Sequence, residues 1–228
     1  MKYWKRFVQI IKKLGMILLI SIILFALMTK KSIAPSVILD EDQKNLLIYN
    51  VLTMVLIKEV DSYIKYYGPE SNVSAEILVR TCDEYDFDLK LMLAQGQLES
   101  HFGTRGLAAI TNSVFNVGAF DDGRILYTYE EPNESIEPYV NLIKKYYLVN
   151  KSVNDLLNKR FVNHKGKRYA SNRSYERKLR DIISDMSGTD IDKLLIERQE
   201  IGKKINKFVD YIKPIEPMNY LAIRTLEK

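Results

Sequence analysis

An uncharged apolar stretch near the N-terminus constrains this chain more than any other feature. Residues 14–29 read LGMILLISIILFALMT, sixteen residues without a charge, and lysines flank them on both sides. A membrane-spanning helix needs about 20 apolar residues, within a range of about 17–25, and flanking lysines extend the usable length because their ammonium groups reach the interface. We therefore predict a transmembrane anchor ahead of the folded part of the chain.

The charges around this segment predict its orientation. Five basic residues precede it and two follow directly, while residues 1–31 contain no acid. The positive-inside rule then places the N-terminus in the cytoplasm and residues 32–228 on the extracytoplasmic side, in a periplasm or cell wall. A cleavable signal peptide is the alternative, but its candidate cleavage site, Ser32-Ile33-Ala34, is weak because Pro35 follows it.

The scarce cysteines and histidines exclude several classes of site. Cys82 is the single cysteine and there are two histidines, so neither a disulfide framework nor a cysteine-based zinc cluster is possible within the chain. We predict no metal and no cofactor. Beyond residue 31 the chain has 27 basic and 29 acidic residues. Because this part is not basic overall, nucleic acid is not an expected partner.

The remaining sequence predicts a mainly α domain of the α+β class. We place a linker at 32–45, the domain at 46–188, and a C-terminal amphipathic helix with a tail at 189–228. The apolar residues 46–57 are too few for a span, so we expect a buried core helix that runs on to Tyr67. Helical spacing and capping residues predict further helices at about 75–85, 89–100, 135–147, 152–158 and 174–186.

Two further patterns predict local structure. Two β-prone runs joined by an Asp-Gly turn within residues 115–129 predict a β-hairpin, and Gly96 predicts close approach of a neighbouring helix. Apolar residues repeat in heptads over 189–212, interrupted by Arg198. A coiled coil that mediates self-association and a helix that packs back on the domain both fit this repeat.

Glu99 is the candidate for chemistry. It lies at the end of a predominantly apolar predicted helix, between Leu98 and Phe102, just before a glycine. Burial against apolar neighbours raises the pKa of a carboxyl group toward the value that a general acid needs. Glycoside hydrolysis requires such an acid beside the leaving oxygen. An exposed helix-end residue without a role is the alternative interpretation.

Four motifs around Glu99 resemble the bacterial glucosaminidase family, glycoside hydrolase family 73. Residues 93–104, LAQGQLESHFGT, resemble its LAQAxLESGWG-like stretch, and residues 112–118, NSVFNVG, resemble its NNLFGIKG-like segment. Residues 129–139 are similar to the next part of the family pattern, which is a tyrosine followed by an acidic residue and an SIxxY sequence. Residues 168–175, RYASNRSY, resemble its late YATDPxY element. The four motifs occur in the expected order, which makes the resemblance specific.

The resemblance implies a lysozyme-like helical domain with a small β-hairpin lobe. It also implies cleavage of the β-1,4 bond between N-acetylglucosamine and N-acetylmuramic acid in peptidoglycan, with Glu99 as general acid. Family members often carry a second acid in the β-lobe, and Asp121 and Asp122 are candidates by position, although an Asp-Gly turn also explains them. Candidate substrate-binding residues from these motifs are Tyr169, Phe115, Asn112, Tyr175, Phe102 and His101.

The chain departs from the family pattern at three positions. His101 and Phe102 replace the usual glycine and tryptophan, and Asn116 stands where glycine is common. These departures predict altered contacts with the sugar. His101 has two interpretations, as a residue that contacts the sugar or the acid and as a surface residue without a role.

A basic segment follows the predicted hairpin. Residues 159–180 contain nine basic residues and one acid. This segment would suit the carboxylates of peptidoglycan stem peptides, and a solvated helix face is the alternative.

Two other functions remain possible from the sequence. A lytic transglycosylase also uses a glutamate before serine, but the Gly-Leu-Met-Gln stretch typical of those enzymes is missing after Glu99. A non-catalytic wall-binding module would use the anchor and the C-terminal helix instead.

Overall fold

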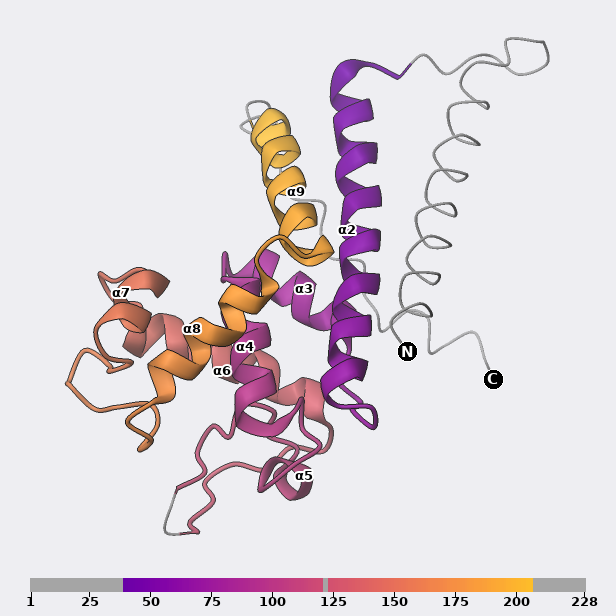
Figure 1. The fold of residues 1–228 in the computed structure, drawn as a ribbon. Helices are drawn as coiled ribbons and strands as arrows, with labels where there is room; N and C mark the ends of the chain where they lie inside the picture. Colours follow the sequence, from indigo (N-terminus) through magenta and orange to yellow (C-terminus); the bar gives the residue numbers. More distant parts are fainter. Residues whose placement is uncertain (1–38, 121–122, 207–228) are drawn as a thin grey trace, which may run out of the picture. The chain divides into compact units, whose positions relative to one another are not determined.

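The computed structural model describes residues 39–120 and 123–206. Their helices, labelled as in Figure 1, are α2 (Glu41–Tyr67), α3 (Ala75–Glu84), α4 (Leu89–Ser100), α5 (Ala108–Thr111), the 3₁₀ helix η1 (Pro132–Ser135), α6 (Ile136–Leu142), the π-helical turn η2 (Ile143–Tyr147), α7 (Val153–Asn158), α8 (Tyr175–Met186) and α9 (Asp190–Asn206). None of these helices is long and apolar enough to cross a membrane. The predicted anchor at 14–29 lies outside the described residues.

Helix α2 begins earlier than predicted, inside the segment assigned to the linker. Asp40 caps it by accepting a hydrogen bond from the Gln43 amide, while the Gln43 side chain accepts from the Asp40 amide. This reciprocal capping box satisfies backbone donors that the first turn would otherwise leave unpaired. The helix therefore starts at Glu41.

Only the second half of α2 is the core helix that the sequence predicted. Its buried apolar residues are Leu56, Val60 and Ile64. The prediction of burial is wrong for the first half, where five apolar side chains are exposed: Leu46, Leu47, Ile48, Val51 and Met54. The physical reason is that α9 covers only the side of this half that carries Tyr49 and Thr53, so the other side faces solvent.

Helix α4 is the central element of the domain. Its residues from Leu89 to Gly96 are buried almost without interruption, so no face of this part is left for solvent. A helix that is apolar all round must be covered on every side. In the structure α3 and α8 both pack against α4 (Figure 1). The predicted core thiol, Cys82 of α3, is buried beside Met92, with 3.7 Å between the two sulfur atoms.

The end of α4 turns back into the core. His101 and Phe102 both adopt left-handed backbone conformations, with φ of 49° and 57°. The Phe102 amide donates to the carbonyl of Gly96, six residues earlier, at 2.9 Å. This bond brings the Phe102 ring over Gly96, where a Cβ atom would lie 2.8 Å from the ring. The close approach predicted at Gly96 is thus made by a phenylalanine ring and not by a neighbouring helix.

The predicted β-hairpin is reduced to a short chain reversal. No sheet occurs within 39–120 and 123–206, and the only antiparallel pairs there are two isolated bridges, Ala119–Ile125 and Val162–Arg168. The first predicted strand cannot extend because Asn116 and Gly118 have φ of 52° and 77°. A left-handed residue breaks the extended backbone that a strand requires.

Helix α9 packs back on the domain. It lies along α2 (Figure 1), as one of the two interpretations of the heptad repeat proposed. Arg198, the residue that interrupts the repeat, is 6% exposed and forms an ion pair with Asp83 of α3. It also donates to the Tyr49 hydroxyl and to Thr53 Oγ1 on α2, each at 2.8 Å. Residues 207–212 lie outside the described residues, and self-association through 189–212 stays a prediction.

Gly96→Ala is expected to destabilise the protein. The new methyl group would overlap the Phe102 ring, which is 1% exposed and has no space to move into. Overpacking of this kind costs about 1–3 kcal/mol. The measurement is the urea dependence of unfolding followed by circular dichroism.

Gly202→Ala is the matched control on α9. A Cβ atom there would lie 3.5 Å from the Tyr49 ring, an ordinary contact. Replacing glycine by alanine within a helix should then add about 0.5–1 kcal/mol of stability. Equal effects of the two substitutions would contradict the packing described at Gly96.

Candidate active site

The Glu99 carboxylate is held by two side chains from distant parts of the sequence. It lies in the last turn of α4, one residue before Ser100. The Tyr175 hydroxyl, at the start of α8, donates to Glu99 Oε1 at 2.6 Å. Asn116 Nδ2 donates to Glu99 Oε2 at 3.3 Å and to the Glu99 backbone carbonyl at 3.0 Å. The carboxylate therefore has a defined orientation at the end of a buried helix.

Behind Tyr175, a buried amide fixes the direction of the hydrogen bond to Glu99. Gln95 has no exposed surface, and its Nε2 donates to the Tyr175 oxygen at 2.8 Å. Its Oε1 accepts from the hydroxyl of Tyr139, which is also fully buried. Since Tyr175 already accepts from Gln95, its own proton is directed to Glu99. The chain of donors runs from Tyr139 through Gln95 and Tyr175 to Glu99.

The environment of Glu99 shifts its acidity in two directions. Burial raises the pKa of the carboxyl above its ordinary value, and the hydrogen bonds from Tyr175 and Asn116 partly oppose that rise. Burial, reinforced by the negative charge of Glu99, raises the pKa of Tyr175 well above its usual value. Tyr175 thus stays protonated and acts as a donor, while Glu99 retains a proton to higher pH than a solvated glutamate.

An aromatic cluster supports this arrangement from the loop before α8. Tyr169 donates its hydroxyl proton to the Phe115 carbonyl at 2.8 Å, and its ring stacks on Tyr175 with 5.9 Å between centroids. Tyr147 and Phe161 each lie 5.5 Å from the Tyr169 ring. Tyr169 and Tyr175, both predicted to bind substrate, are therefore neighbours beside Glu99.

Three of the residues predicted to contact substrate lie in the core, since Tyr175 is 4% exposed and two phenylalanines are buried further. Phe115 and Phe102 are each 1% exposed. Phe115 stacks on Tyr139 with 3.8 Å between centroids, and both phenylalanine rings approach Gly96. At that exposure a ring has no surface left for a sugar. The two phenylalanines instead form the packed layer beneath the site.

Asn112 and His101 stabilise chain turns. Asn112 has a φ of 55°, and its Nδ2 donates to the carbonyls of Tyr129 and Glu130 at 3.0 Å each. His101 caps α4, and its Nδ1 lies 3.1 Å from the Tyr67 carbonyl. Each contact secures a loop that flanks Glu99. Asp121 and Asp122, the candidates for a second acid, lie outside the described residues.

Three residues of the site, Gln95, Tyr139 and Asn116, are not candidates from the sequence alone. A local signal existed for Gln95, because it stands four residues before Glu99 and so occupies the same face of the helix. Asn116 was marked only as a departure from the usual glycine. The signal for Tyr139 is its place as the last residue of the SIxxY motif, but its contact with Gln95, 44 residues away in the sequence, has no local signal.

Comparison with protein families places this site in a known context. The glucosaminidase family model, described as mannosyl-glycoprotein endo-beta-N-acetylglucosaminidase, matches residues 75–188. The chain belongs to this family. The match spans half of the 228 residues and includes Glu99 and all four motifs. Comparison with curated proteins gave no match. Membership makes the glucosaminidase domain a glycoside hydrolase and supports peptidoglycan hydrolysis in general terms.

Tyr175→Phe should move the pH profile of the glucosaminidase domain upward. The substitution removes a hydrogen bond that lowers the pKa of Glu99, while burial continues to raise it. A general acid works in its protonated form, so activity falls as pH rises through its pKa. The measurement is the pH dependence of kcat/KM on a glycan substrate. In the variant, kcat/KM should fall at a higher pH than in the wild type.

Tyr66→Phe serves as the control, because this tyrosine is 76% exposed and loses the same hydroxyl group away from Glu99. If the fall of kcat/KM at high pH occurs at the same pH or at a lower pH in Tyr175→Phe, the Tyr175 hydroxyl does not lower the pKa of Glu99.

Proposed function

We propose that this protein is a peptidoglycan hydrolase that cleaves the β-1,4 bond between N-acetylglucosamine and N-acetylmuramic acid. The observation that carries the proposal is the Glu99 carboxyl, oriented by Tyr175 and Asn116 within a glucosaminidase-family domain. Peptidoglycan glycan strands are the proposed partner.

Glu99 acts as the general acid in this proposal. Burial raises the pKa of its carboxyl group, so Glu99 retains its proton to higher pH than a solvated glutamate, and hydrolysis requires that proton on the leaving glycosidic oxygen. Both oxygens of the carboxyl group accept hydrogen bonds, Oε1 from the Tyr175 hydroxyl and Oε2 from Asn116 Nδ2. Asn116 Nδ2 beside Oε2 then stabilises the carboxylate that remains after transfer.

The second half of the reaction needs a group on the opposite face of the sugar. A water activated by an aspartate, with Asp121 or Asp122 as the candidates, and attack by the substrate's own acetamido group are the two routes. An inverting pair of carboxyls is separated by about 6.5–9.5 Å, which leaves space for a water molecule. The stereochemistry of the product, measured by NMR, distinguishes an inverting enzyme from a retaining one.

Glu99→Gln is expected to abolish hydrolysis with little change in the fold. Glutamine keeps an oxygen that accepts from Tyr175 but carries no transferable proton, so the rate should fall by about 10²–10⁴-fold. The assay is digestion of purified peptidoglycan, followed by mass spectrometry of the reduced fragments. Wild type should release new N-acetylglucosamine reducing ends that the variant does not.

Other products would identify a different activity. Anhydro-muramyl ends would place the protein among the lytic transglycosylases. Binding to the wall without any cleavage by wild type would indicate a non-catalytic module.

We also propose that residues 14–29 anchor the enzyme in a membrane. Residues 1–31 would form the cytoplasmic stub and anchor, and a tether would lead to α2 at Glu41, with the catalytic domain on the extracytoplasmic side. The charge asymmetry around the apolar segment supports this orientation.

A tag placed after Lys228 tests the topology. In spheroplasts the tag should be removed by external protease and the protein should sediment with membranes. Intact mass analysis separates the anchor from a cleaved signal, because cleavage near residue 34 would shorten the protein. A protected tag would contradict the proposed orientation.

A further inference from the structure

A basic pocket is lined in part by Arg168 and Glu176, the sequence neighbours of Tyr169 and Tyr175. It has a volume of about 480 Å³ and is lined by Lys159, Arg160, Arg168, Arg173 and Glu176. An adjoining hollow of about 590 Å³ shares Lys159 and Arg160 with it. The pocket thus contains four cations and one carboxylate, a composition that favours an anionic ligand.

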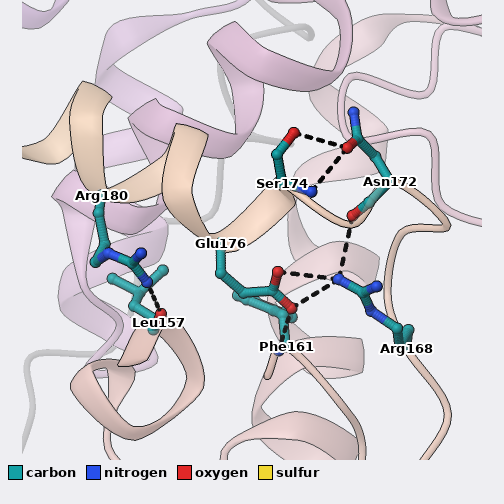
Figure 2. Close-up of polar contacts among 7 residues, drawn as sticks. All are labelled: Leu157, Phe161, Arg168, Asn172, Ser174, Glu176 and Arg180. Atoms are coloured by element: carbon teal, nitrogen blue, oxygen red, sulfur yellow. Dashed lines mark hydrogen bonds and ion pairs between the residues drawn. The ribbon is translucent and has the colours of Figure 1, made fainter. Parts of the chain in front are cut away.

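The one carboxylate in the pocket is already used by the protein. Glu176 accepts from the Phe161 amide at 2.8 Å and from Arg168 Nη2, which lies 3.0 and 2.9 Å from its two oxygens (Figure 2). Arg168 Nη2 also donates to the Asn172 carbonyl at 3.1 Å. Glu176 therefore neutralises Arg168 and leaves the charge of the other cations uncompensated within the pocket.

Arg160 and Arg173 carry most of this uncompensated charge. Both are exposed, and neither forms an ion pair with any residue of 39–120 or 123–206. Lys159 is partly paired with Asp155 at 3.4 Å. The planar guanidinium presents parallel N–H donors that match the two oxygens of a carboxylate. Two unpaired arginines at the rim are therefore suited to carboxylate groups.

The pocket and the candidate active site share the same short segments. Arg168 directly precedes Tyr169, which donates to the Phe115 carbonyl, and Glu176 directly follows Tyr175, which donates to Glu99. Arg180 of α8 additionally donates to the Leu157 carbonyl and joins α8 to α7 (Figure 2). These contacts hold the pocket rigidly next to the groups that orient the acid.

We propose that this pocket binds the carboxylates of peptidoglycan stem peptides while the glycan strand lies at Glu99. The inference rests on the proposed function, and it makes the enzyme selective for strands that still carry their peptides. The pocket supplies binding energy away from the reacting bond, so its loss should act on KM more than on kcat.

The test compares two substrates with one variant in the full-length protein. The substrates are peptidoglycan freed of phosphodiester polymers, and the same strands after an amidase has removed the stem peptides. Wild type is expected to show about a tenfold higher kcat/KM on the peptide-bearing strands. The double variant Arg160→Ser/Arg173→Ser should raise KM on the peptide-bearing strands about tenfold, since two charge-assisted contacts are lost. The ratio of kcat/KM on peptide-bearing strands to kcat/KM on peptide-free strands should then be close to one.

Arg177→Ser/Lys178→Ser is the matched control. It removes the same charge from exposed positions on α8 that do not line the pocket. This variant should keep the preference for peptide-bearing strands. An equal loss in both variants would show that overall charge, and not the pocket, attracts the substrate, and would overturn the inference.

Sedimentation with insoluble peptidoglycan separates this inference from the proposed function. If wild type cleaves neither substrate, the hydrolase proposal fails, and the binding assay still tests the pocket. Retention on peptide-bearing material that Arg160→Ser/Arg173→Ser loses supports the carboxylate site. Retention that requires phosphodiester polymers on the wall, or that the variant keeps, would overturn it.

Discussion

The candidate site depends on one buried amide. Gln95 accepts a hydrogen bond from Tyr139 and donates one to Tyr175, so it joins α4, α6 and α8 through polar groups that water does not reach. Buried polar groups must be paired, because an unpaired one costs its full desolvation energy. The hydroxyl that orients Glu99 is consequently fixed by the packing of three helices.

The same few residues serve packing and chemistry. The left-handed end of α4 places Phe102 over Gly96, and Ser100 Oγ donates to the Val114 carbonyl at 2.6 Å while accepting from the Gly103 amide at 2.7 Å. These contacts draw residues 112–118 against the end of the helix, where Asn116 reaches Glu99. The position of the carboxyl is thus a consequence of how α4 terminates.

The surroundings of Glu99 and the lining of the basic pocket differ in charge. The described contacts of Glu99 are to neutral side chains, a tyrosine and an asparagine, beside an aromatic cluster. The cations Lys159, Arg160, Arg168 and Arg173 line the basic pocket instead. Because an arginine next to Glu99 would lower its pKa, this separation preserves a carboxyl that retains its proton.

The sequence alone determined the features that depend on near neighbours in the chain. Helix spacing and the capping residues Ser74 and Asp88 predicted α3 and α4, and the motifs around Glu99 predicted the family that the comparison shows. Tertiary structure decided the partners of Glu99, since Tyr175 is 76 residues away from it in the sequence. It also buried Phe102 and Phe115, exposed the first half of α2, and reduced the hairpin to a single bridge. Caps and periodicity act within a few residues, whereas burial depends on which distant helices pack together.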